Sequence, residues 1–144
     1  MNKRITNIEE RNDILEKYPI ENILSLLKDT LGENILVRDI ATINNNIMLE
    51  VNNLDDDSTY FIKMTKILEE HPFVSRIGII VSNESKTHFI KYMYTYTKDN
   101  YSSIICKVAE KYRKGNVWIT KDAFTINVER EKGLIKENVK AKTR

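Results

Sequence analysis

Apolar and polar residues alternate along several segments of the chain, and this alternation predicts β-strands. Residues 35–43 and 47–51 flank an asparagine turn at 44–46 and predict a first hairpin. Residues 73–81 and 87–97 flank the polar segment 82–85 and predict a second hairpin. Residues 117–120 and 123–128 predict either a third hairpin or one bent strand.

Helical spacing of apolar residues separates these hairpins. The clearest example places Ile20, Ile23, Leu24, Leu27 and Leu31 on one stripe, with Gly32 as a C-terminal cap. Similar patterns predict helices that begin near residues 58 and 101, the last carrying a stripe at positions 101, 104, 105, 108 and 112. A capping-box spacing at 6–9 predicts a further short helix over 7–17, which ends before Pro19.

The predicted order is helix then hairpin, three times over. We therefore expect an α+β fold, with an antiparallel sheet of about six strands and the helices packed on one face. Residues 1–129 are expected to form a single compact domain, followed by a charged tail at 130–144. The other face of the sheet is expected to be open to solvent or to a partner.

The segment 88–97 indicates which face of the sheet points into the core, because successive side chains of a strand point to opposite faces. His88, Ile90, Tyr92, Tyr94 and Tyr96 share one face, whereas Phe89, Lys91 and Met93 share the other. Burying the second face would strip Lys91 of its hydration, at a cost of several kcal/mol unless the ammonium is paired. The tyrosine face is therefore predicted to point into the core.

The same sorting of the other strands predicts an outer face that is both basic and apolar. In the first strand, Ile35, Val37, Ala41 and Ile43 are predicted inward, which leaves Asp39 unexplained on that face. The residues predicted to form the partner-binding surface are Arg38, Arg76, Phe89, Lys91, Met93 and Trp118, with Ile40 and Ile80 as possible additions. If the 7–17 helix or the tail covered this face, the surface would be structural instead.

The composition of the chain indicates the kind of genome and the cellular compartment to expect. Ile, Lys and Asn supply 20, 16 and 15 of the 144 residues, which points to an AT-rich genome such as that of a low-GC bacterium, its phages or its plasmids. The single cysteine, Cys106, excludes an intramolecular disulfide and favours a reducing cytoplasm. No signal peptide or apolar run of about 20 residues is present in the sequence, so no membrane association is expected.

Charge is distributed unevenly along the chain. Residues 1–97 carry 11 Lys/Arg and 15 Asp/Glu, whereas residues 98–144 carry 12 Lys/Arg and 6 Asp/Glu. The basic C-terminal third could contact an anionic partner, or it could be a solvated helix and tail. The candidate nucleic-acid-binding residues on the helix predicted near 101 are Lys107, Lys111, Arg113 and Lys114.

Catalytic and metal-binding patterns are not found in the sequence. The acidic run 55–57 is expected to cap a helix, and Cys106 is expected to be buried within one. With only two histidines, His71 and His88, the chain has too few ligands for a structural zinc site. No phosphate-binding glycine loop or nucleophile motif occurs, so we expect neither a metal, a cofactor nor an enzymatic activity.

Two functional hypotheses remain. The first is a small cytoplasmic regulatory protein, such as a phage- or plasmid-type inhibitor, that binds a protein partner or itself through the open sheet face. The alternative is a nucleic-acid-binding protein that uses the basic third helix and the aromatic residues of the sheet face.

Overall fold

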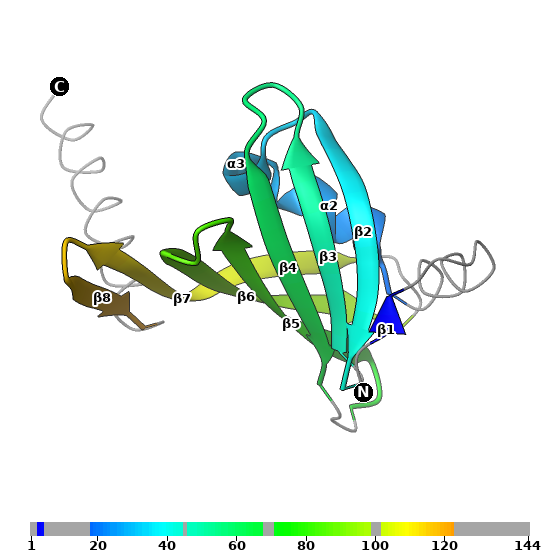
Figure 1. Ribbon diagram of the computed structural model, residues 1–144. Coiled ribbons are helices and arrows are strands. Elements are labelled where there is room, and N and C mark those ends of the chain that lie inside the picture. The colour runs from blue at the N-terminus through cyan, green and yellow to red at the C-terminus, as the bar shows by residue number, and fades with distance from the viewer. Residues whose placement is uncertain (1–2, 5–17, 45, 68–70, 99–101, 123–144) are drawn as a thin grey trace, which may run out of the picture.

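The computed structural model describes residues 3–4, 18–44, 46–67, 71–98 and 102–122. These residues form one antiparallel sheet of eight strands, in which spatial order follows chain order (Figure 1). The strands are β1 (Lys3–Arg4), β2 (Ile35–Ile43), β3 (Asn46–Asn53), β4 (Thr59–Lys66), β5 (Val74–Asn83), β6 (His88–Thr97), β7 (Ser103–Lys114) and β8 (Val117–Lys121). The described helices, α2 (Ile20–Leu26) and α3 (Lys28–Leu31), precede β2.

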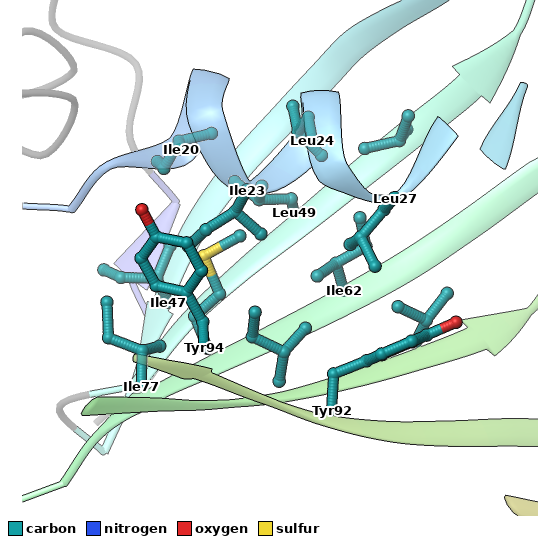
Figure 2. Close-up of a cluster of buried hydrophobic side chains, with 14 of the residues drawn as sticks. Ile20, Ile23, Leu24, Leu27, Ile47, Leu49, Ile62, Ile77, Tyr92 and Tyr94 are labelled. Atoms are coloured by element: carbon teal, nitrogen blue, oxygen red, sulfur yellow. The ribbon is translucent and has the colours of Figure 1, made fainter. Parts of the chain in front are cut away.

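Both described helices pack on one face of the sheet, which we call the inner face. The five apolar residues of the predicted helical stripe are all buried, which confirms that prediction. Figure 2 shows the first four of them, from Ile20 to Leu27, against inner-face side chains of the middle strands, which include Leu49, Ile62 and Ile77. Leu27 (φ −100°, ψ 15°) divides the predicted helix into α2 and α3.

The predicted α+β fold of helix–hairpin units is wrong. The helices predicted near residues 58 and 101 are the strands β4 and β7, so the sheet is larger and the helical part smaller than expected. The two hairpins β2–β3 and β5–β6 and the strand at 117–120 are confirmed. Among the described residues, the architecture is a sheet meander with one short helical segment on its inner face.

Strand β4 was misassigned because the helical and the strand period coincide at one of its residues, Met64. Phe61 and Met64 fit a helical stripe, but Tyr60, Ile62 and Met64 alternate as a strand requires. Cross-strand neighbours share a face, and Ile62 is paired with Leu49 and Val81, both buried. Phe61 therefore points away from the core.

A β-bulge interrupts the alternation of inward and outward side chains in β7. Lys91 of β6 pairs with Ala109, whereas Tyr92 pairs with Lys107, so Val108 is the additional residue. Ile105 and Tyr112 consequently lie on the inner face although they are seven positions apart in sequence. This break in period two produced the apparent helical spacing.

A second β-bulge, in β2, changes which of its side chains face the core. The register shifts between Val37 and Asp39, and Ile40 then pairs with buried Leu49. Ile40 is itself buried, so its predicted outward orientation is wrong. Ala41 pairs with Met48 on the opposite face and was wrongly predicted inward, as was Ile43, two residues further on. The bulge also explains Asp39, which it removes from the inner face.

The prediction for the tyrosines of β6 is confirmed. Tyr94 is 1% exposed and Tyr92 is 7% exposed, and Tyr96 packs partly buried against the same core. Figure 2 shows both Tyr92 and Tyr94 on the helix side of the sheet. Their hydroxyls form hydrogen bonds, Tyr94 with Asn22 Nδ2 at 2.6 Å and Tyr92 with Thr30 Oγ1 at 2.8 Å.

Three sequence predictions lie outside the described residues: the helix at 7–17, the strand at 123–128 and the charged tail at 130–144. Within the described part of the chain, no helix is long and apolar enough to cross a membrane.

Candidate interaction surface on the outer face of the sheet

The sheet face turned away from α2 and α3, which we call the outer face, carries large side chains in register. One row across the strands runs Phe61, Ser82, Phe89, Lys111 and Thr120. The row beside it runs Met48, Lys63, Ile80, Lys91 and Ala109. Apolar and basic side chains therefore alternate along the second row, and also along β6 at Phe89, Lys91 and Met93.

A shallow hollow of about 270 Å³ lies where these rows cross β5–β8. Its lining residues are Ile80, Phe89, Lys91, Ala109, Glu110, Lys111 and Thr120. The carboxylate of Glu110 is directed to Lys107 and His88, which share the inner face with it. Apart from Thr120, the remaining side chains that line the hollow are consequently apolar or cationic.

Aromatic rings border this hollow and already contact lysines. The rings of Phe89 and Trp118 lie 6.2 Å apart, and Lys111 Nζ lies 4.7 Å from the centre of the Trp118 ring. On β4, the Phe61 ring is covered by Lys86 Nζ at 4.0 Å. Such cation–π contacts stabilise the ring positions by about 0.5–1 kcal/mol at exposed sites.

Charge differs between the two ends of the outer face. Within strands β5–β8 the register places no carboxylate on it. The basic side chains there are Arg76, Lys91, Lys111 and Arg113. Asp39 and Glu50, on β2 and β3, supply the acidic groups at the other end. The β5–β8 part thus presents a cationic surface around an apolar hollow.

The structure brings together four of the six residues predicted for the partner-binding surface. Phe89, Lys91 and Met93 lie on the outer face of β6, and Trp118 of β8 contacts Phe89. Arg76 is on the same face of β5, where it pairs with Thr95. Arg38 is separated from this group by β3, β4 and β5, and its guanidinium donates to Asn52 Oδ1 at 3.1 Å.

The alternative basic set does not form one surface. The predicted third helix is β7, and Lys107 lies on its inner face while Lys111 and Arg113 lie on its outer face. Lys114 pairs with Val117 at the β7–β8 turn, on the inner side. The helical part of the nucleic-acid hypothesis is therefore wrong, because strand geometry divides the four cations between two faces.

Sequence reasoning missed the outer-face residues Phe61, Lys63 and Lys111. The first two were assigned to a helix, and Lys111 was considered only as a helical phosphate contact. The alternation of Tyr60, Ile62 and Met64, together with the β-propensity of the segment 59–65, was the signal for a strand at this point.

Other candidate groups have local structural roles. The acidic run 55–57 forms the β3–β4 turn instead of a helix cap, and Asn53 Oδ1 accepts from the backbone N of Asp55 at 2.8 Å. Ser58 forms hydrogen bonds that lower the pKa of Asp56. His71 Nδ1 accepts from the backbone N of Phe73 and of Val74, at 3.1 and 3.2 Å.

Cys106 is exposed, contrary to the prediction of a buried helical cysteine. It pairs with Met93 and therefore lies on the outer face. Among the described residues, no group of three or more His, Cys, Asp or Glu side chains could hold a metal ion.

Comparison of this chain with protein-family models, with curated proteins and with solved structures finds no match in any of the three. The outer face must therefore be interpreted from its own chemistry.

Proposed function

We propose that this chain is a small, non-enzymatic regulatory protein that binds a protein partner through the outer face of β5–β8. The observation that carries the proposal is the hollow lined by Ile80, Phe89 and Lys91, next to the exposed Trp118. Aromatic residues, Met and Arg are enriched at protein interfaces, and a few anchors in a desolvated pocket provide most of the binding energy.

The charge of the surface defines the chemistry of the partner. Cationic side chains surround an apolar hollow, so the complementary surface has an apolar anchor residue flanked by Asp or Glu. A hollow of about 270 Å³ is large enough for one aromatic or aliphatic side chain. A partner segment of this kind would meet no carboxylate on the outer face of β5–β8.

A single-stranded nucleic acid would also need aromatic and basic side chains, but the ring contacts favour a protein. Bases stack on free ring faces. Lys86 covers one face of Phe61 and Lys111 covers one face of Trp118. Stacking on these covered faces would first have to displace the lysines, whereas an apolar anchor can enter the hollow without moving them.

The single cysteine allows a direct test. A photo-activatable cross-linker attached to Cys106 lies on the outer face, opposite Met93. Cross-linking in host lysate, followed by mass spectrometry, should give one dominant protein adduct that survives nuclease treatment. The triple variant Phe89→Ser, Lys91→Ser, Met93→Ser should lose this adduct, since removal of two anchors and a cation costs more than about 2 kcal/mol of binding.

The matched control is Leu36→Ser, which changes an exposed apolar residue of β2, four strands from β6. This variant should retain the adduct. Equal cross-linking by the triple variant would contradict the proposal. Loss of the adduct on nuclease treatment, with a salt-sensitive gel shift by the purified chain, would assign the surface to nucleic acid instead.

A further inference from the structure

A second cavity lies on the side of the sheet opposite the proposed partner surface. It has a volume of about 300 Å³ and lies between α3 and the strands β4, β5, β6 and β7. Its apolar wall consists of Tyr60, Val81 and Ile90. This volume is at the lower end of the range for small-molecule sites, which combine an apolar wall with a few convergent polar groups.

One polar atom at this cavity has no partner. His88 Nε2 is buried and forms no hydrogen bond. Glu110 Oε1 lies 3.6 Å from it, which is too long for a hydrogen bond. A buried polar atom without a partner costs free energy, so a group that binds there and hydrogen-bonds to Nε2 would recover it.

Most of the neutral polar groups of the cavity are already engaged. Asn83 Oδ1 accepts from the backbone N of Thr87 and of His88, at 2.9 and 3.0 Å. Its Nδ2 donates to Thr87 Oγ1, and the Thr30 hydroxyl is bonded to Tyr92. Binding capacity therefore remains mainly at the charged groups and at His88.

The charged groups at the cavity are two carboxylates, Asp29 and Glu110, and one ammonium, Lys107. Lys107 Nζ lies 3.4 Å from Glu110 Oε1, so Glu110 already accepts an ammonium group there, over a long contact. Burial raises the pKa of Tyr92 beside the cavity, and the negative charges of Glu110 and Asp29 add to that rise. The electrostatic potential in the cavity is therefore negative.

We propose that this cavity binds a small organic cation of the aliphatic primary amine class. The ammonium group donates to Glu110 and to His88 Nε2, with the imidazole in its neutral Nδ1–H form. The methylene chain packs against Tyr60, Val81 and Ile90. Lys107 is then an intramolecular competitor for Glu110, and the ligand displaces it.

An NMR titration of the full chain tests this assignment. Butylammonium is the probe, and butanol and butyrate are matched in chain length but differ in charge, all at constant ionic strength. We expect saturable shifts of the His88, Tyr60 and Tyr92 ring signals with butylammonium alone. Saturable binding of butyrate or butanol with equal affinity, or no saturable shift with butylammonium, would overturn the proposal.

Three variants make the test specific. Glu110→Gln keeps the shape of the side chain and should weaken binding about tenfold, through loss of a charge-assisted hydrogen bond. Lys107→Met should strengthen binding about threefold, since it removes the competitor. Lys111→Met makes the same change of charge on the outer face and should leave the affinity unchanged. Equal affinities of Glu110→Gln and the parent chain, with both folded by circular dichroism, would also overturn the proposal.

Discussion

The two faces of strand β6 have different surroundings although their residues alternate along one short segment. On the inner face, Tyr92 and Tyr94 are buried, and both of their hydroxyls are hydrogen-bonded to the helical segment. On the outer face, Phe89, Lys91 and Met93 have no described helix over them. Under the proposed function, one strand of this thin fold serves stability through its inner face and recognition through its outer face.

The difference arises because the two faces supply partners to different polar groups. A tyrosine can be buried if its hydroxyl reaches a partner, and α2 and α3 supply Asn22 and Thr30 for that purpose. If the outer face were buried to the same depth, its lysine ammonium groups would require carboxylates as partners. The register places no carboxylate on the outer face of β5–β8. Substitutions on the two faces should therefore have separable effects on stability and on binding.

The largest expected effect is that of Tyr94→Ala. The ring is 1% exposed, so its removal leaves a cavity and should lower the free energy of unfolding by about 3–5 kcal/mol. Its sequence neighbour Met93, on the outer face, is the matched control. Met93→Ala should cost less than about 1 kcal/mol. Urea denaturation of the two variants measures both values, and equal losses would contradict the division of roles between the faces.

A second prediction concerns the connection that leads from α3 to β2. Gly32 has φ +95°, and a Cβ atom there would lie 2.3 Å from Asn53 Nδ2. That nitrogen donates to the backbone oxygen of Leu31, so the clash would disturb the end of α3. Gly32→Ala should destabilise the fold by about 2–3 kcal/mol, from backbone strain and from the lost hydrogen bond.

Gly115 in the β7–β8 turn is the control for Gly32. It also has a positive φ, +64°, but an added Cβ would meet nothing within 4 Å. Gly115→Ala should cost only about 1 kcal/mol, the cost of the left-handed conformation itself. Thermal unfolding of both variants compares the two sites. A larger loss at Gly115 would mean that contact with Asn53 is unimportant for positioning α3.

The parts of the fold that could be predicted were those in which period and burial agree along the sequence. The stripe from Ile20 to Leu31 and the alternation of the tyrosines in β6 are uninterrupted, and both were assigned correctly. Strand β7 was not, because the bulge at Val108 shifts the phase by one residue. Bulges depend on pairing with a neighbouring strand, and that pairing is not encoded in the spacing of one segment.

The candidate surface was predictable only in part for the same reason. Phe89, Lys91 and Met93 could be placed together because they alternate within one strand. Their proximity to Trp118 depends on the order of β6, β7 and β8 in the sheet. Phe61 was not predicted on the outer face, because β4 was predicted to be a helix and helical spacing would direct this residue inward. Strand order therefore determined which aromatic residues form one surface.

The smallest expected effect is a dependence of stability on alkaline pH that originates on the inner face. Burial raises the pKa of Tyr92, the hydrogen bond with Thr30 opposes that rise, and the charges of Glu110 and Asp29 add to it. The unfolded chain therefore loses this proton first, at about pH 10. Stability should be complete below that pH and should decrease as the pH rises through the folded-state pKa.

The variant Tyr92→Phe isolates this contribution. It keeps the ring in the core but has no proton to lose, so its stability should decrease less steeply above about pH 10 than that of the parent chain. Some decrease should remain, because burial also raises the pKa of Tyr18. Urea denaturation at several pH values between 8 and 11 gives both slopes. Identical slopes would show that the Tyr92 hydroxyl is no more buried in the folded chain than in the unfolded one, and the contrast between the two faces of β6 would then depend on Tyr94 alone.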